Sequence, residues 1–338
     1  MTRLADYGFS PRWQALVSEY GPDTQLARVT RHDGVAVQVV TETGPCTLPL
    51  RRGLPPVTVG DWLACDDERV IAPLHRSSLL RRAANGEEQL LAANVDVVLL
   101  VMGLDRPLKA GRIRRGEALA YDAGARPLLV LTKADLANEV DAILAGVESD
   151  HPGIDVLATS ASTGQGLDAL RDRLSQSTSV LIGESGAGKS RLVNALVGAD
   201  VAELGAVREV DRKGRHTTTS RQMHLLPTGG VVIDSPGIRA VGLAGDGESV
   251  VTAFADIEEL GRTCHFSDCQ HVGEPDCAVL LAVEAGDLAE DRLTAYRELR
   301  AEAVSATRRA DEHERRSHER RFTKEQQRFV RSKHHRKK

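Results

Sequence analysis

The 338-residue chain has few aromatic residues and no long apolar run. Phe, Trp and Tyr together make up 3% of the sequence, so its cores must be built from aliphatic side chains. No window approaches the roughly 18 consecutive apolar residues of a membrane-spanning helix. The first 20 residues also lack the apolar centre of a secretory signal. We therefore expect a cytoplasmic protein that does not contact membranes.

Charge is distributed unevenly along the chain. The formal net charge is −4, but residues 308–338 contain 13 Lys/Arg and 5 Asp/Glu, a net charge of +8. That leaves −4 minus +8, or −12, for the other residues. A basic tail on an acidic body favours a polyanionic partner such as RNA, although a solvated helix end that only aids solubility would carry the same charge.

Two patterns of predicted secondary structure follow one another along the chain. Short β-like segments are predicted at 35–39, 57–59, 62–63 and 69–71, with the hairpin dipeptide Asp33-Gly34 before the first. Such short strands indicate a small barrel; an OB-type barrel would suit RNA binding, and a spacer barrel or sandwich fits equally well. From about residue 81, apolar strands alternate with helical segments, which indicates a parallel sheet covered on both faces.

A glycine-rich segment between a predicted strand and a predicted helix has the sequence of a phosphate loop. It follows the strand Ser179–Ile182 and opens the helix Lys189–Val197, which is the context that G-x-x-x-x-G-K-S requires. Its backbone N–H groups and the helix N-terminus favour phosphate. We expect Lys189 to contact the β- and γ-phosphates and Ser190 to ligate Mg²⁺. The predicted nucleotide contacts here are Gly183, Glu184, Ser185, Gly186, Ala187, Gly188, Lys189, Ser190 and Arg191.

A second motif, D-x-x-G, follows the apolar strand Val231–Ile233. Asp234 can hold Mg²⁺ through water, and the N–H of Gly237 can sense the γ-phosphate. Between the two motifs, Thr217 and Thr218 lie in a stretch rich in Gly, Lys and Arg, as in switch loops that close over Mg²⁺. We predict both threonines as nucleotide contacts and Thr218 as the magnesium ligand; an ordinary polar surface loop is the alternative.

Two further motifs resemble the base-reading loops of GTPases. Thr132-Lys133-Ala134-Asp135 has the form of N-K-x-D with Thr in the Asn position. The Asp135 carboxylate can accept hydrogen bonds from guanine N1–H and its 2-amino group, a donor pair that adenine lacks. Ser160 and Ala161 match the S-A loop, whose backbone N–H meets guanine O6. These residues predict GTP and GDP, with Mg²⁺, as ligands.

Both base-reading motifs precede the phosphate loop, whereas a conventional GTPase has them after it. Ligands of open α/β sheets bind at the carboxyl ends of strands, and every motif except the switch threonines directly follows an apolar strand. Rejoining the connections leaves that edge unchanged, so all the motifs can meet at one nucleotide. The sequence therefore predicts a circularly permuted GTPase. The chain leaves the second switch at Gly237 towards the C-terminal region, a route that we expect to transmit the nucleotide state.

Three cysteines and a histidine crowd into 14 residues near the C-terminus. Three thiolates and one imidazole make a closed tetrahedral zinc site, which is structural, and a loop this short depends on the metal to fold. His265 is a competing imidazole, and free thiols or a disulfide are the alternatives to metal. We predict one Zn²⁺ per chain, held by Cys264, Cys269, His271 and Cys277.

Together these residues resemble the RsgA family of circularly permuted, ribosome small subunit-dependent GTPases. The resemblance covers nearly the whole chain and includes Val59-Gly60-Asp61-Trp62, the segment 89–96 and Glu274-Pro275. It implies an α/β P-loop GTPase domain, circularly permuted, with an N-terminal OB-type β-barrel and a C-terminal zinc-binding helical domain. We expect an N-terminal tail at 1–20, the barrel at 21–80, the GTPase domain at 81–248, and the zinc-binding and helical domain with its basic tail at 249–338.

The resemblance further implies a function. It predicts binding to the 30S ribosomal subunit and its 16S rRNA late in maturation, slow intrinsic GTP hydrolysis, and stimulation by the ribosome. We expect a monomer. Two other functions stay open: a nucleotide-stabilised RNA-binding protein without significant turnover, and a permuted GTPase that acts on another RNA. Intact Lys189, Ser190 and Asp234 favour hydrolysis.

The residue after Gly237 bears on the mechanism. It is Ile238, at the position where Ras-like enzymes have the glutamine that orients the attacking water. Because isoleucine cannot hydrogen-bond water, intrinsic turnover should be slow. We predict Lys189, Thr218 and His216 as catalytic residues, with His216 orienting water once the ribosome orders its loop. A group from ribosomal RNA, or a His216 that contacts RNA phosphate or shapes the loop, fits equally well.

Overall fold

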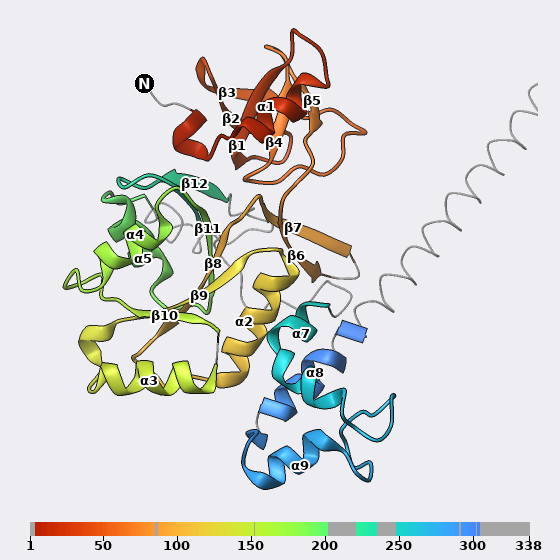
Figure 1. Cartoon of the computed structure of the whole chain (residues 1–338). Coiled ribbons are helices and arrows are strands. Elements are labelled where there is room, and N and C mark those ends of the chain that lie inside the picture. Colours follow the sequence, from red (N-terminus) through yellow and green to blue (C-terminus); the bar gives the residue numbers. More distant parts are fainter. Residues whose placement is uncertain are drawn as a thin grey trace, which may run out of the picture. The chain divides into compact units, whose positions relative to one another are not determined.

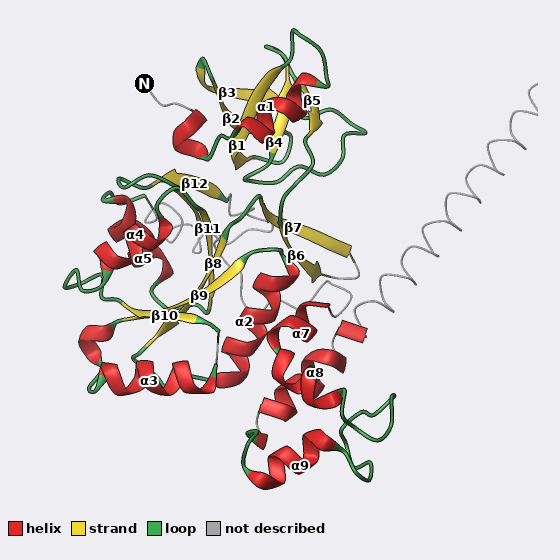
Figure 2. Ribbon diagram, viewed as in Figure 1, coloured by secondary structure: helices red, strands yellow, loops and turns green. Residues whose placement is uncertain are grey.

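The computed structural model describes residues 4–84, 87–151, 153–201, 221–234, 248–290, 292–301 and 303–304. The chain forms two compact units, residues 1–81 with 90–241 and residues 82–89 with 242–338. Figure 1 follows the elements along the chain, and Figure 2 separates helices from strands. None of the helices in these ranges has the length and apolar character needed to cross a bilayer.

The first unit begins with a small antiparallel sheet of five strands in the order β3-β2-β1-β4-β5 (Figure 1). These are β1 (Gln25–His32), β2 (Ala36–Thr41), β3 (Gly44–Pro49), β4 (Trp62–Cys65) and β5 (Val70–Pro73). No ladder joins β3 to β5 within the described residues, so OB-type closure stays a prediction. The strand predicted at 57–59 does not form, because the Thr58 N–H bonds at 2.8 Å to the buried carboxylate of Asp61 in a turn.

The N-terminal residues pack on this sheet. The sequence predicts only a tail at 1–20, but the structure contains a 3₁₀ turn (Leu4–Tyr7) and helix α1 (Pro11–Ser18). Proline at the first helical position is already set to the helical φ. The Trp13 ring stacks on Trp62 with centroids 5.4 Å apart, and both side chains are buried. This stacking makes the N-terminal stretch part of the core.

A six-stranded sheet forms the rest of the first unit, in the order β10-β9-β8-β11-β13-β12. All its pairs are parallel except that of β12 with β13. Helices α2 and α3 contribute to the core on one face, and α4 and α5 to the core on the other. The elements are β8 (Val97–Gly103), α2 (Ala110–Asp122), β9 (Arg126–Thr132), a 3₁₀ turn (Ala134–Leu136), α3 (Val140–Asp150), β10 (Asp155–Ala158), α4 (Leu167–Leu174), β11 (Thr178–Gly183), α5 (Lys189–Val197), β12 (Gln222–Leu225) and β13 (Val231–Asp234).

Strand β8 shows why the central strands read as continuous apolar runs. Val98 and Leu100 belong to the core that includes α2, whereas Val97, Leu99 and Val101 belong to the core that includes α5. Both faces of the strand are therefore buried, and polar residues have no place on either of them.

A buried arginine joins the small antiparallel sheet to the parallel one. The Arg28 guanidinium on β1 donates hydrogen bonds to the Tyr7 carbonyl and, at 2.8 Å, to the Thr178 hydroxyl at the start of β11. It also lies over the Trp62 ring, 5.0 Å from the centroid. Burial lowers the pKa of Arg28 to about 10, against the opposing effect of Asp96 and Asp61, so the group stays charged at neutral pH. A backbone pairing of Arg31 with Gln222 adds a second link, between β1 and β12.

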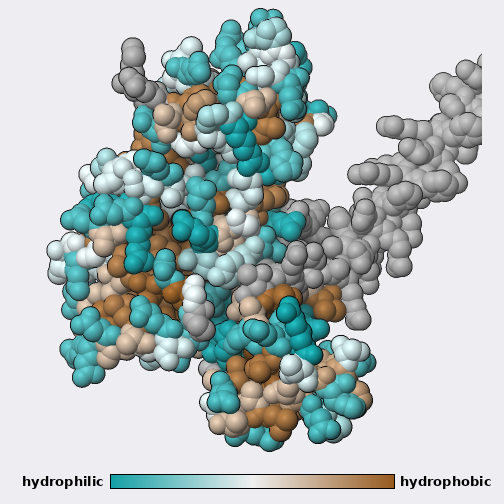
Figure 3. All heavy atoms as spheres, viewed as in Figure 1, coloured by the Kyte–Doolittle hydropathy of each residue, from teal (hydrophilic) through white to brown (hydrophobic). Residues whose placement is uncertain are grey.

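The second unit is mainly helical. It contains α7 (Glu248–Ala253), α8 (Ala255–Gly261), α9 (Ala278–Ala285) and a helical stretch at 292–301. Strands β6 (Leu79–Ala84) and β7 (Glu87–Ala93) pair with each other, and only residues 82–89 of them belong to this unit. Arg292 forms a two-bond ion pair with Asp256 at 2.6 and 2.7 Å, and Phe254 packs against Tyr296. Some large apolar side chains nevertheless remain exposed, and brown residues reach the surface of this unit in Figure 3. They are Val251, Phe266, Val272, Leu281 and Val304.

Replacing Arg28 tests the junction between the sheets. Arg28→Met keeps much of the side-chain volume but leaves the Tyr7 carbonyl and the Thr178 hydroxyl without their donor. We expect a loss of about 2–4 kcal/mol in the free energy of unfolding. Urea unfolding followed by tryptophan fluorescence measures it well, because Trp13 and Trp62 are the two tryptophans of the chain and both belong to this subdomain core.

Arg31→Met is the matched control on the same strand. The Arg31 side chain is 36% exposed, so this change should cost less than about 0.5 kcal/mol. Equal losses in the two variants would contradict a special role for Arg28.

Candidate nucleotide-binding site and metal centre

The predicted nucleotide motifs lie at one edge of the parallel sheet. In the strand register, Gly183 at the end of β11 is level with Val101 of β8, and Gly103 at the end of β8 is level with Thr132 of β9. Strand β10 ends at Ala158, level with Leu131. The phosphate loop, the T-K-A-D loop and the S-A loop therefore all begin at carboxyl ends of parallel strands of one sheet, as the permuted order requires.

The phosphate loop turns sharply at its first glycine. Gly183 has φ 153°, and a Cβ there would lie 2.3 Å from the Val101 carbonyl oxygen, so a larger residue does not fit. At the other end, Gly188 caps helix α5, which begins with Lys189. The Lys189 ammonium donates hydrogen bonds of 2.7 Å to the carbonyls of Gly183 and Glu184. It is thus held over the loop, where phosphate oxygens can take the place of these carbonyls.

The T-K-A-D loop is bonded directly to the phosphate loop. The buried Thr132 hydroxyl lies 2.5 Å from the Ala187 carbonyl oxygen, to which it donates. The Lys133 ammonium donates a 2.7 Å hydrogen bond to the Gly186 carbonyl. Although threonine cannot copy both functions of an asparagine amide, it keeps the donor that ties the two loops together.

The S-A loop meets the aspartate of the base-reading motif. The Ser160 hydroxyl donates a 2.5 Å hydrogen bond to a carboxylate oxygen of Asp135 and accepts the N–H groups of Ser162 and Thr163 at 3.2 Å. Asp135 itself is exposed, so its carboxylate is accessible to a ligand. Residues 25 positions apart are thereby fixed beside each other, as the predicted base-reading site requires.

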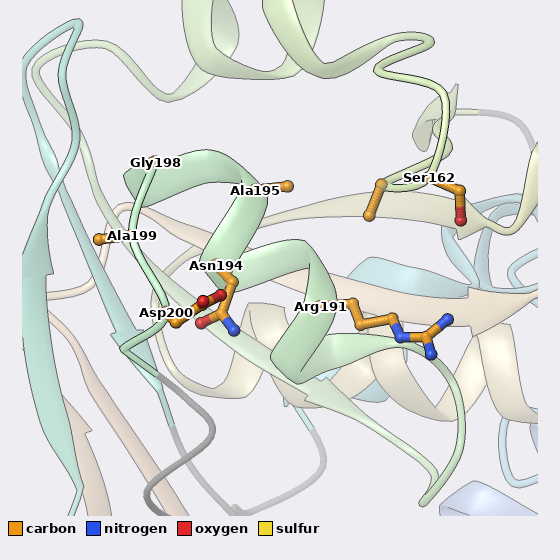
Figure 4. A pocket seen from close by; sticks show the side chains of 8 residues that line it. Ser162, Arg191, Asn194, Ala195, Gly198, Ala199 and Asp200 are labelled. Atoms are coloured by element: carbon orange, nitrogen blue, oxygen red, sulfur yellow. The ribbon is translucent and has the colours of Figure 1, made fainter.

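A cavity of about 520 Å³ lies between the S-A loop and helix α5, within the size range of small-molecule sites. It is lined by Ala161 and Ser162 from the loop and by Arg191 and Asn194 from the helix, together with the turn that follows α5. Figure 4 shows Arg191, Asn194 and Asp200 on the helix side and Ser162 on the other. Two predicted nucleotide contacts, Ala161 and Arg191, therefore line the same hollow.

Of the predicted magnesium ligands and switch residues, the structure describes Ser190 and Asp234. Ser190 is exposed in the first turn of α5, and the half-buried Asp234 ends β13, which pairs with the phosphate-loop strand β11. Gly237, His216, Thr217 and Thr218 lie outside the described residues, as do Ile238 and the basic tail.

Sequence reasoning missed two ion pairs beside the phosphate loop. Asp105, just after β8, bonds the Lys133 ammonium at 2.8 Å, and Arg112 in α2 forms an ion pair with Glu184. The signal for Asp105 was its place after an apolar strand at the same sheet edge as the recognised motifs. Nothing in the sequence pairs Arg112 with Glu184, which lies 72 positions away.

The Cys/His cluster could hold a metal ion. Ligand atoms of Cys264, Cys269, His271 and Cys277 all lie within 4.8 Å of one another. The Cys264 Sγ lies 3.8 Å from the Cys277 Sγ and 3.6 Å from the His271 Nδ1. Tetrahedral zinc with ordinary bond lengths requires about 3.8 Å between two sulfurs and about 3.6 Å between sulfur and nitrogen. The cluster therefore fits one zinc ion, and all of the cysteines are free of disulfides.

His265, the alternative imidazole for the zinc site, does not belong to the Cys/His cluster. Its ring lies edge-on to Phe266 with centroids 4.7 Å apart. The His271 ring presents Nδ1 to the cysteines, while Nε2 faces Gly261 at the end of α8, where a Cβ would lie 3.3 Å away.

A carboxylate organises the loop that carries His271. Glu274 accepts the backbone N–H groups of Gln270, Val272 and Gly273 at 2.8, 2.8 and 3.0 Å. These N–H bonds, that of Gly273 first, lower the pKa of Glu274 to about 2. The residue is thus ionised at neutral pH and holds the turn in which His271 has φ 57°.

The fold and loops define a class of protein. A phosphate loop, a T-K-x-D loop and an S-A loop share one sheet edge, and the last two come first along the chain. This is the arrangement of a circularly permuted P-loop GTPase. The solved structure titled as YloQ, a circularly permuted GTPase, has the same fold, with a TM-score of 0.60 and 24% identity over 83% of this chain and 96% of that one.

The chain belongs to the RsgA GTPase family, whose sequence model matches residues 73–244. A relative from Streptomyces avermitilis named small ribosomal subunit biogenesis GTPase RsgA is 44% identical over 312 residues, 88% of this chain and 84% of the relative. One of the same name from Streptomyces coelicolor is 42% identical, over 88% and 86%. The crystal structure of YjeQ from Thermotoga maritima matches with a TM-score of 0.62 and 30% identity, over 83% and 99%. The chain is therefore a GTPase.

Removing the Thr132 hydroxyl tests the bond between the loops. In Thr132→Val the Ala187 carbonyl loses its donor, so the two loops are held less firmly. We expect the GDP dissociation constant to rise about fivefold to tenfold, as for one lost hydrogen bond of about 1 kcal/mol. Isothermal titration measures the change. Thr228→Val, whose exposed hydroxyl lies 3.4 Å from its acceptor, should bind as the wild type does. An unchanged constant in Thr132→Val would show that the bond is irrelevant to binding.

Glu274→Gln tests the zinc loop. Glutamine keeps one acceptor oxygen but turns N–H donors towards the backbone N–H groups that Glu274 now binds. We expect about a tenfold lower zinc affinity, the usual size of an effect from groups that support metal ligands. Competition with a chromophoric chelator measures it, with Glu284→Gln on α9 as the matched control. Equal affinity in both variants would exclude a supporting role for Glu274.

Proposed function

We propose that this GTPase binds the small ribosomal subunit and assists its late maturation. The names of relatives that match 88% of the chain at 42–44% identity support this proposal. The observation that carries the nucleotide part is the pair of hydrogen bonds from Thr132 and Lys133 to the phosphate loop, which joins base reading to phosphate binding.

The predicted residues divide the nucleotide between them. In this proposal Asp135 accepts the guanine N–H groups, Lys133 lies along the base, and the backbone of Ser160 and Ala161 meets O6. The residues from Gly183 to Arg191 surround the phosphates. Ser190, Thr218 and Asp234 would hold a magnesium ion, which would supply positive charge beside the β- and γ-phosphates. Lys189 exchanges its carbonyl partners for phosphate oxygens when nucleotide binds.

Binding to RNA is assigned to the outer parts of the chain. We assign the contacts with 16S rRNA to the N-terminal antiparallel sheet, proposed as an OB-type barrel, and to the basic tail, because a tail of +8 favours phosphates. The Cys₃His cluster holds one structural zinc that shapes the second unit. The protein acts as a monomer in the cytoplasm.

Hydrolysis is proposed to be slow until the ribosome is bound. Ile238 cannot orient water, so the missing function comes either from His216 in the first switch or from ribosomal RNA. These two sources make different predictions. A catalytic His216 is needed for stimulated turnover but not for nucleotide binding, whereas a His216 that only contacts RNA phosphate affects the affinity for the ribosome.

Turnover assays with ribosomal particles test the proposal. We expect 30S subunits, and not 50S subunits, to stimulate GTP hydrolysis, and excess ATP not to compete, because adenine lacks the donors that Asp135 reads. Lys189→Ala should abolish turnover. Cosedimentation with 30S subunits should weaken steeply with salt. Turnover that 30S subunits leave unchanged would favour a nucleotide-stabilised RNA-binding protein, and stimulation by 50S subunits or another RNA would favour the third function.

The same turnover and cosedimentation assays with His216→Ala test whether His216 is catalytic. Loss of stimulated turnover with unchanged GDP affinity and unchanged cosedimentation supports a catalytic His216. Turnover equal to that of the wild type at saturating 30S would contradict it.

A further inference from the structure

The loop that follows strand β8 contains a residue that the nucleotide motifs do not include. Strand β8 ends at Gly103, level with Thr132, so the chain from Gly103 to Asp105 emerges beside the T-K-A-D loop. We propose that Asp105 is a positioning residue of the guanine site: it holds Lys133 in place and thereby slows the release of the nucleotide. This inference rests on the proposed guanine site.

Lys133 is held at two points. Its ammonium donates to the Gly186 carbonyl at 2.7 Å and to a carboxylate oxygen of Asp105 at 2.8 Å. The lysine backbone has φ 60°, a left-handed conformation that residues other than glycine adopt rarely. Because the four-carbon lysine stem is flexible, the partners of its ammonium decide where the side chain lies. Asp105 fixes it from β8, and Gly186 fixes it from the phosphate loop.

Gly103 leaves room for the ion pair between Asp105 and Lys133. A Cβ on Gly103 would lie 2.4 Å from the Asp105 carboxylate and 3.5 Å from the Lys133 stem. Alanine would therefore displace the carboxylate without changing any charge. A glycine at this point lets the carboxylate and the lysine stem come together.

The ion pair is electrostatically consistent with this role. The hydrogen bond from Lys133 is the main cause of the lowered pKa of Asp105, and Arg106 acts in the same direction. The carboxylate is therefore charged at neutral pH. Both side chains of the pair are between a quarter and a third exposed, so solvent weakens the attraction and a moderate effect is expected.

Asp105 matters for the order of the T-K-A-D loop because this loop begins with threonine and not with asparagine. Thr132 supplies one hydroxyl donor, which goes to Ala187, whereas an asparagine amide could donate twice and accept as well. With fewer bonds from the first residue of the motif, more of the loop's order depends on Lys133. Asp105 provides that order from a neighbouring strand.

The test uses the full-length protein and the rate at which fluorescent mant-GDP leaves it. We expect Asp105→Asn to speed release about fivefold, since asparagine keeps the size but not the charge. Gly103→Ala should speed release in the same direction. In the Lys133→Ala background, Asp105→Asn should have no further effect, because a residue that acts through Lys133 has nothing left to position.

Two controls separate positioning from general stability. Asp172→Asn makes the same charge change on helix α4 and should release mant-GDP as the wild type does. The melting temperature of the nucleotide-free protein should be equal in Asp105→Asn and the wild type. A lowered melting temperature, or an undiminished effect of Asp105→Asn on release in the Lys133→Ala background, would overturn the positioning role.

The outcomes also separate this inference from the proposed site. If the wild type binds mant-GDP and Asp105→Asn releases it at the same rate, the role of Asp105 is wrong and the guanine site stands. If the wild type does not bind mant-GDP at all, the guanine site falls, and the inference falls with it.

Discussion

Parallel hydrogen bonding among β8, β9, β10, β11 and β13 is the constraint on which the site depends. Because parallel strands run in one direction, their carboxyl ends share one edge, whatever order the connections take along the chain. The loops that bear Lys189, Lys133 and Ser160 meet there for that reason alone. Permuting the chain changes which segments enter and leave the domain, but it leaves the meeting point of the loops unchanged.

At that edge, side chains bond to main-chain carbonyls of the neighbouring loop. Thr132 and Lys133 both donate to the phosphate loop, so its position is set partly from β9. Strand β8 adds Asp105, and α2 adds the ion pair of Arg112 with Glu184. Thr132, Lys133 and Arg112 thus bond the phosphate loop directly, whereas Asp105 supports it only through Lys133.

The sequence predicts the local parts of the site well and the distant ones poorly. The phosphate loop is a contiguous motif, and the ligands from Cys264 to Cys277 are close neighbours in sequence, so pattern and spacing are enough to find them. Asp105 and Arg112 are single charged residues whose partners lie 28 and 72 positions away. The place of Asp105 after an apolar strand indicates the sheet edge but not its partner, and nothing local distinguishes Arg112. The packing of α1 was missed for a similar reason: Trp13 owes its place to Trp62, a contact that no short-range period encodes.

The buried guanidinium of Arg28 has a consequence for the order in which the molecule is made. Its hydroxyl partner, Thr178, is 150 residues further along, so at about 5–20 residues per second the ribosome needs roughly 8–30 s to supply it. Until then the apolar core of the N-terminal sheet is complete in sequence, but the Arg28 guanidinium beside it lacks one of its hydrogen-bond partners. The first part of the chain to be synthesised therefore completes its native contacts only after β11 is made, and a nascent chain released before β11 would hold an N-terminal sheet without this hydrogen bond.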